Sequence, residues 1–278
     1  MWFGTSVRRN TSRSGLALAV ALLAGVAYAE EQAQPAGAPP TELVDPVDPE
    51  AFALATRAGD FLRDAKRFGF SAESGYEVVQ EDGSKLEFGS ARRYLVQRPD
   101  RVRVETEPRE GGRRLTLFDG KSFVQADLGE NAYARADLKQ PRDIDFMIDL
   151  VRERLGAPLP LAELLRNNPR RPIEDSLEAA DVVGTERLRG VDCDHVALRN
   201  PDADLQLWIE RGAQPLVRRI VITYRNLDGQ PSFWADLDDW SFAPELSEAS
   251  FRYDPPDGAE RVRFDVRPAP APSEQGAP

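Results

Sequence analysis

The chain has 278 residues, carries 47 acidic against 36 basic side chains and has a formal net charge of −11 at pH 7. This acidic balance argues against a nucleic-acid partner, because phosphates bind to a basic patch, and it disfavours a chain that lies flat on anionic lipid. The single cysteine, Cys193, excludes an internal disulfide, so we expect stability to come from the hydrophobic core.

The first 29 residues have the pattern of a secretory signal peptide. Three arginines precede an apolar run over residues 16–24, and residues 27–29 read Ala-Tyr-Ala, which is the small-x-small pattern of a signal-peptidase site. We therefore predict export to the periplasm, cleavage before Glu30 and no membrane anchor. The run is shorter than the roughly 20 apolar residues that span a bilayer, and no cysteine follows it to carry a lipid. An uncleaved anchor and the twin-arginine export route stay open as alternatives.

The domain boundaries follow from composition. Residues 30–47 and residues 267–278 are rich in proline and alanine and poor in large apolar side chains, which predicts a disordered linker and a disordered tail. Between them, residues 48–266 are long enough for one sizeable domain.

A helix is predicted at the start of this domain. Asp48 is placed to cap it and Pro49 suits its first turn. Apolar residues then recur every three or four positions from Phe52 to Phe68, which indicates one buried helical face. Gly69 is expected to end the helix.

Short strands follow the helix. Apolar and polar residues alternate from residue 70 to residue 104, with a hairpin signal, Glu-Asp-Gly-Ser, at residues 81–84. Glycine-containing turns at residues 111–112, 119–120 and 129–131 separate further short strands. This spacing predicts an antiparallel meander.

A second helix interrupts the strands. Apolar residues from Ile144 to Leu155 fit the helical period, Asp143 is placed to cap and Gly156 to end it, and a helical turn is predicted at residues 161–165. The remaining strands are predicted at residues 182–188, 191–199, 205–210, 216–225 and 233–240.

Few residues indicate catalytic or metal chemistry. Cys193 and His195, the only histidine, fall on the same face of one strand, but a zinc site needs three or four ligands and no second Cys or His exists. We therefore interpret both as packed strand residues. Asp236 and Asp238 also share a strand face, which a hydrolase or cation site could use, without a calcium-loop pattern around them. We predict no catalytic residue, no metal and no cofactor.

The paired arginines at residues 92–93, 113–114 and 218–219 are assigned to solvated strand faces.

The tryptophans say more about a possible ligand site. In residues 205–210 and 233–237, one strand face is aliphatic and is expected to lie under a helix, whereas the other mixes indoles with polar groups.

The predicted ligand-binding residues are Trp208, Trp234, Trp240 and Tyr224. Alternation places Trp234 and Trp240 on the same face, as part of a concave surface that a helix closes over an apolar or amphipathic ligand. Long side chains that cover a sheet edge are the alternative. If Trp234 is an anchor, Trp234→Ala is expected to weaken binding by about 2 kcal/mol.

The order of the predicted elements, together with short motifs along the chain, resembles a known group of proteins. The motifs are Arg-Pro-Asp-Arg-Val-Arg at residues 98–103, Phe-Asp-Gly-Lys at 118–121, Asn-Ala-Tyr-Ala at 131–134, Leu-Pro-Leu-Ala-Glu-Leu-Leu at 159–165, Gly-Val-Asp-Cys-Asp-His at 190–195, Leu-Trp-Ile-Glu at 207–210, Ile-Thr-Tyr at 222–224 and Pro-Pro-Asp-Gly-Ala at 255–259. Over about residues 50–260 the chain resembles a bacterial family of predicted periplasmic proteins of unknown function. Its architecture is similar to the LolA/LolB-like half-barrel of periplasmic lipoprotein carriers.

The resemblance implies an α+β fold, a curved antiparallel sheet (half-barrel) wrapped around or covered by a few helices, and it carries over no catalytic residue. We therefore expect a non-enzymatic periplasmic binding or chaperone-like protein for a lipid, lipoprotein or other apolar partner. An envelope protein-interaction or regulatory module without a small ligand is the alternative, and a hydrolase ranks below both. One departure from the carriers is that Asp236 and Asp238 accompany the indoles, whereas the carriers' cavity is strongly apolar.

Overall fold

The structure, a computed structural model, describes residues 46–155 and 161–264. Its helical elements are α1 (Pro49–Asp64), α2 (Ile144–Leu150), the π-helical turn η1 (Val151–Leu155), α3 (Ala162–Leu165), α4 (Arg171–Ser176) and the 3₁₀ turn η2 (Glu248–Phe251). Its strands are β1 (Arg67–Val79), β2 (Lys85–Gln97), β3 (Arg101–Pro108), β4 (Arg114–Phe118), β5 (Ser122–Asp127), β6 (Ala132–Asp137), β7 (Ala179–Leu188), β8 (Val191–Arg199), β9 (Ala203–Glu210), β10 (Val217–Tyr224), β11 (Ser232–Ser241) and β12 (Glu260–Val262).

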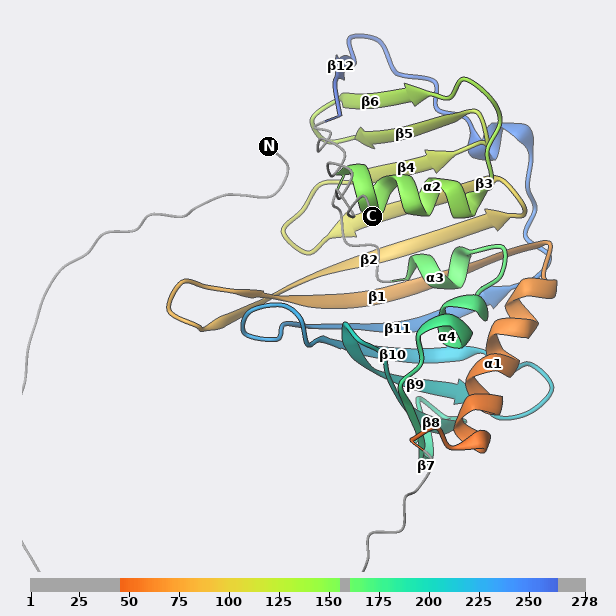
Figure 1. Cartoon of the computed structure of the whole chain (residues 1–278). Coiled ribbons are helices and arrows are strands. Elements are labelled where there is room, and N and C mark those ends of the chain that lie inside the picture. Colours follow the sequence, from red (N-terminus) through yellow and green to blue (C-terminus); the bar gives the residue numbers. More distant parts are fainter. Residues whose placement is uncertain (1–45, 156–160, 265–278) are drawn as a thin grey trace, which may run out of the picture. The chain divides into compact units, whose positions relative to one another are not determined.

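The strands of the described residues form one curved sheet that does not close on itself. Their order is β12-β6-β5-β4-β3-β2-β1-β11-β10-β9-β8-β7, and neighbouring strands are antiparallel except β12, which pairs in parallel with β6. Helices α1 to α4 all lie on one face of this sheet (Figure 1). We call that face the helix side and the opposite face the outer side. The predicted α+β class, a curved antiparallel sheet covered by a few helices, is confirmed.

Helix α1 begins as predicted but ends earlier. Asp48 accepts a hydrogen bond from the backbone N–H of Glu50 at 2.7 Å and so caps the first turn. The helix ends at Asp64, and Phe68, which the apolar period assigned to it, lies in β1. The prediction fails here because Phe68 fits both the helical stripe and the first inward position of a strand, and the ladder from Arg67 onward with β2 decides for the strand.

The main core lies between the helices and the helix side of the sheet. Helix α1 presents Ala51, Ala55 and Ala58 to it, and these short side chains let the helix approach β7, β8 and β9 closely. On β9 and β11, Ile209 and Leu237 are fully buried in the same core. The prediction that the aliphatic face of these strands lies under a helix is therefore confirmed.

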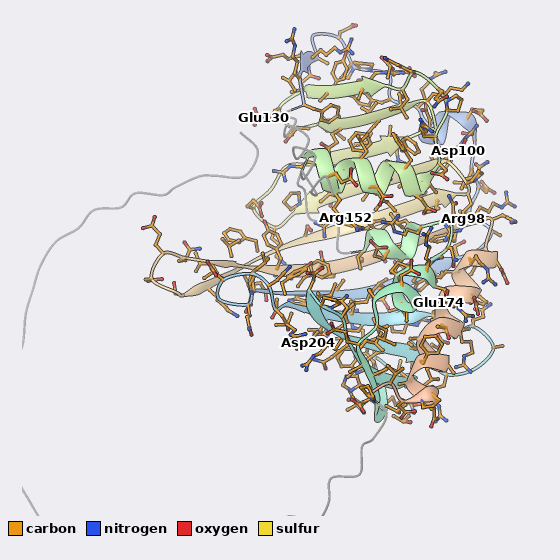
Figure 2. The ribbon with its side chains drawn as sticks, in the orientation of Figure 1. Arg98, Asp100, Glu130, Arg152, Glu174 and Asp204 are labelled. Carbon is orange, nitrogen blue, oxygen red and sulfur yellow. The ribbon has the colours of Figure 1, made fainter. Side chains whose placement is uncertain are left out.

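Helices α2 and α3 cover the other half of the helix side. Asp143 caps α2 as predicted, because its carboxylate accepts from the backbone N–H of Phe146 at 2.9 Å. Arg98, labelled beside α3 in Figure 2, donates from Nη1 to the carbonyl oxygen of Leu165 at 2.8 Å. The guanidinium carbon of Arg98 lies 5.0 Å from the ring centre of Phe68, and burial lowers the pKa of Arg98 to about 10. Helix α3 is thus held through a backbone carbonyl.

A smaller apolar cluster lies on the outer side of the sheet. Leu115 and Leu117 of β4 pack there with Val124 of β5, and Tyr253 from the segment between η2 and β12 covers them. This segment then returns to the sheet as β12. The outer side of β4 to β6 is therefore covered by chain, without a helix from the α1–α4 layer.

Several predictions fall on residues that the structure does not describe. The predicted signal peptide at residues 1–29, the tail at residues 267–278, the predicted helix end at Gly156 and nearly all of the linker at residues 30–47 lie outside the described residues. In the part of the chain that is described, no helix has the length and apolar character needed to cross a membrane.

Candidate functional site

The four residues predicted to bind ligand do not come together in one site. Trp208 and Trp234 lie on the outer side of the sheet, where their indole N–H groups bond to Glu186 and Glu87. Trp240 and Tyr224 pack against the core on the helix side. A single concave surface with all four residues is therefore ruled out by the geometry.

A β-bulge separates Trp234 from Trp240. Asp239 has φ 53°, and the pairing register of β11 with β1 shifts between Gly69 and Ser71. One extra residue at this point reverses which face the following side chains occupy. The prediction that Trp234 and Trp240 share a face is therefore wrong, because strict alternation assumes an uninterrupted strand.

Trp240 belongs to a stack of rings on the helix side. Its ring centre lies 4.5 Å from that of Phe70, which lies 4.4 Å from that of Tyr94 on its other side. Burial raises the pKa of Tyr94 to about 12 and also raises the pKa of Tyr224. The rings of Trp240, Phe70 and Tyr94 occupy the part of the helix side that the helices cover, which we call the closed end. Tyr224 lies at the other end of its strand, beside the β10–β11 loop.

On the outer side, both the ring and the N–H group of Trp208 have partners within the protein. The ring of His195 stacks on the indole with centres 4.1 Å apart. The two oxygens of Glu186 bond to His195 Nδ1 at 2.9 Å and accept from Trp208 Nε1 at 3.0 Å. The hydrogen bond from Trp208, followed by that from His195, lowers the pKa of Glu186. Trp208 is only 9% exposed although no helix covers it.

Trp234 continues this arrangement toward β2. The guanidinium of Arg219 lies between the two indoles, 5.7 Å from the ring centre of Trp208 and 5.5 Å from that of Trp234. The indole lies across Gly75, where a Cβ atom would be 2.5 Å from Nε1, and donates to Glu87 at 3.1 Å. Arg109 also bonds to Glu87 and stands 5.7 Å from the same ring. These residues form a set that we call the outer ladder: His195, Trp208, Arg219, Trp234 and Arg109, with the carboxylates of Glu186 and Glu87.

The outer ladder gives both indoles partners within the protein. A ligand-binding role for Trp208 or Trp234 stays a prediction.

Asp236, considered above for a hydrolase or cation site, accepts from Arg189 at 2.6 Å and from Arg219 at 2.7 Å, one on each oxygen. Its carboxylate therefore belongs to the same network of ion pairs.

Cys193 and His195 are packed strand residues, as predicted. Cys193 is fully buried and His195 is 7% exposed. Burial is the first cause that raises the pKa of the Cys193 thiol, which favours its protonated form. Across the described ranges, no three His, Cys, Asp or Glu side chains are grouped so that they could hold a metal ion.

An exposed apolar surface on the helix side was not predicted from the sequence. The β1–β2 hairpin projects beyond the helices, beside the loop that joins β10 and β11 (Figure 1). On its helix side, Tyr76 pairs with Phe88 and Val78 pairs with Leu86. Leu86 is 49% exposed and Phe88 38% exposed. We call these four residues the hairpin patch.

The signal for the hairpin patch was present in the sequence. The turn at residues 81–84 was predicted, and two-residue alternation on both sides of it places all four side chains on one face. What the sequence could not provide is how far the helices extend along that face. The patch is exposed because the helical cover ends before it.

A polar stretch lies between the closed end and the hairpin patch. Arg92 donates to the hydroxyl of Ser74, which donates to the carbonyl of Ser90 at 3.2 Å. Short side chains, Ala72 and Thr106, face Arg92 from the two neighbouring strands. The assignment of residues 92–93 to a solvated face holds for the exposed Arg93, whereas Arg92 is half-buried on the helix side.

Two open pockets lie at other places on the described surface. One, of about 480 Å³, lies at the end of α1 and is lined by residues that include Phe61, Lys66 and Phe242. The other, of about 400 Å³, is lined by Arg135 and by residues 261–264. Neither includes a predicted ligand-binding residue in its lining.

A family model matches almost all of the domain that the structure describes. The model of a family described as "Predicted periplasmic protein (DUF2092)" matches residues 51–265. No protein of curated function matches the chain in sequence.

Several solved structures are similar to this chain over most of its length. An uncharacterised conserved protein from Thermus thermophilus is 14% identical, with 75% of this chain and 98% of that chain covered and a TM-score of 0.45. The lipoprotein LppX of Mycobacterium tuberculosis is 11% identical, with 72% and 100% covered and a TM-score of 0.44. A LolA superfamily protein from Nitrosomonas europaea is 12% identical, with 73% and 97% covered and a TM-score of 0.38.

Proposed function

Because the chain belongs to this family of predicted periplasmic proteins, we propose that it works in the periplasm as a non-enzymatic binding protein for an acyl chain. The ligand lies on the helix side of the β1–β2 hairpin, against the hairpin patch. The observation that carries this proposal is the exposure of Leu86 and Phe88 on the face that elsewhere forms the core. The proposal includes export by the signal peptide at residues 1–29.

The position of the hairpin patch supports an apolar ligand. Tyr76 packs against the edge of the main core and stacks on Phe88, with ring centres 5.8 Å apart. The patch therefore borders the main core through Tyr76, and the polar stretch around Ser74 and Arg92 separates it from the closed end. An acyl chain that covers Leu86 and Phe88 removes their apolar surface from water, at about 25 cal/mol for each Å² covered.

The hairpin is also held in place before a ligand binds. Lys85 donates to Glu77 and to the backbone carbonyl of Gln230, both at 3.0 Å, and so ties the hairpin to the β10–β11 loop. The backbone N–H of Ser232 adds a bond to Glu77 at 2.7 Å. A surface that is ordered in advance loses less conformational entropy on binding.

A neutral lipid with one chain tests the proposal. Isothermal titration with monopalmitoylglycerol below its critical micelle concentration is expected to show saturable binding. Leu86→Ser removes about half of a buried leucine's contribution and should weaken binding by about 1 kcal/mol, close to fivefold. Leu128→Ser is the matched control, because Leu128 is a leucine of similar exposure, 40%, in the β5–β6 turn.

Two results contradict the proposal. One is the absence of saturable binding, and the other is an equal effect of the two leucine substitutions. Either result, together with an envelope protein crosslinked to the hairpin in intact cells, favours the protein-interaction alternative.

A further inference from the structure

Arg92 is a half-buried cation on the helix side of β2. Most arginines on the sheet hold a carboxylate oxygen within 4.0 Å, as Arg103, Arg218 and Arg219 do. For Arg92 no such partner is found among the described residues, although the whole chain has eleven more acidic than basic side chains. Its one hydrogen-bond partner in the described part of the chain is the hydroxyl of Ser74.

The surroundings of Arg92 hold its guanidinium on the helix side. Ser74 and Ser90 are buried, and their hydroxyls are 3.4 Å apart, so the Ser74 hydroxyl is itself fixed when it accepts from Nη1 of Arg92. A guanidinium has five N–H donors in a planar fork, and one bond to a hydroxyl leaves others for a further acceptor. Burial, followed by the charge of Glu110, raises the pKa of the Tyr76 phenol, and the charge of Arg92 acts in the opposite direction.

From these observations we infer that Arg92 binds the carboxylate of a long-chain fatty acid whose acyl chain lies along the hairpin patch. This inference rests on the proposed function and names its ligand class. A planar carboxylate matches the guanidinium fork with two parallel hydrogen bonds. Arg92 and the patch lie on the same strand face, since Arg92, Phe88 and Leu86 are separated by even numbers of residues.

The spacing along β2 fits a single extended chain. Leu86 is six residues from Arg92, which is about 20 Å at roughly 3.3 Å per residue. Phe88 lies between them on the same face and is 38% exposed. The charged group therefore binds at the inner end of the patch, and the acyl chain runs outward toward the hairpin turn.

The experiment compares palmitate with monopalmitoylglycerol, which has the same acyl chain and no charge. Binding of both probes is measured by isothermal titration to the exported protein and to its Arg92→Gln and Arg93→Gln variants. Palmitate is expected to bind about tenfold or more tightly than the ester, as hydrogen bonds to charged groups allow. Arg92→Gln should weaken the binding of palmitate by more than that of the ester and so remove this preference.

Arg93→Gln is the control, because Arg93 is the next residue, is exposed and faces the outer side. It removes the same charge from the protein and should leave the preference for palmitate intact. Arg92→Lys keeps the positive charge without the planar pair of guanidinium donors, and should retain part of the preference for palmitate.

The outcomes separate this inference from the proposed function. Equal affinities of the two probes, or an equal loss of preference in Arg92→Gln and Arg93→Gln, would overturn the inference and leave acyl-chain binding standing. If neither probe binds, the proposed function fails, and the inference fails with it.

Discussion

On the outer side of the sheet, the indoles of Trp208 and Trp234 contact cations, carboxylates and another ring, whereas on the helix side of the hairpin Phe88 remains 38% exposed with Tyr76 stacked on it. The same kinds of side chain thus have different roles on the two faces. The outer ladder covers a face that has no helical layer. The hairpin patch leaves apolar surface where the helical layer ends.

This difference teaches that a tryptophan among polar residues does not by itself indicate a ligand site. Indole N–H groups need acceptors, and neighbouring strands supply them here through Glu186 and Glu87. The more informative features are apolar residues without cover and a cation without a carboxylate. The following predictions test whether the two faces differ in this way.

The largest effect is expected at the closed end. Phe70 is 2% exposed and lies between the rings of Tyr94 and Trp240. Phe70→Ala should lower the free energy of unfolding by about 3–5 kcal/mol, because it removes a buried ring from a packed core. Urea unfolding followed by circular dichroism measures this. A loss below about 1 kcal/mol would show that the ring stack is not part of a rigid core.

A smaller loss of stability is expected for Trp208 in the outer ladder. Trp208→Ala removes the stack with His195 and the bond to Glu186, and should cost about 2–3 kcal/mol, less than a core tryptophan because water can enter from the outer side. The affinity for palmitate should not change. Unfolding and titration on the same preparation separate the two effects.

Trp234 gives the sharpest contrast between a structural and a binding role. Its ring is half-buried, and Trp234→Ala should lower the free energy of unfolding by about 1–2 kcal/mol with palmitate affinity unchanged. The competing expectation, formed from the sequence, is a loss of about 2 kcal/mol of binding free energy. If titration shows that loss, the outer side is a ligand site and the comparison of the two faces fails.

The smallest effect is a pH dependence at the β7 edge of the outer ladder. The folded-state pKa of Glu186 is lowered, so its stabilising contribution is present above the unfolded value of about 4.3 and is lost as pH falls through the folded value. The stability difference between the wild type and Glu186→Gln should therefore shrink from pH 6 toward pH 3. Glu130→Gln, on an exposed turn far from β7 in Figure 2, should show no such trend. A constant difference for Glu186→Gln would contradict its role in the ladder.

Much of the fold could be predicted because its elements follow simple periods. Two-residue alternation assigned Leu207 and Leu237 to the buried face, and the capping roles of Asp48 and Asp143 followed from residue type and position. These signals are local, so one sequence is enough to detect them. The end of α1 was missed because Phe68 satisfies a helical and a strand period equally.

The candidate site was harder to predict because it depends on contacts between distant residues. One positive φ at Asp239 reverses the face of Trp240, and no residue pattern announces that bulge. The partners of Trp234 come from β1, β2 and β10 and the turn after β3, which strand order alone brings together. The exposure of Leu86 depends on where α2 and α3 end over the sheet.

A photoreactive palmitate with a diazirine at the end of its acyl chain tests the central claim most directly. After irradiation, tandem mass spectrometry locates the modified residues one by one. The account predicts adducts at the hairpin patch, on Val78, Leu86 or Phe88, and their loss when unlabelled palmitate competes. Adducts concentrated on Trp208 and Trp234 would contradict it and place the ligand on the outer side.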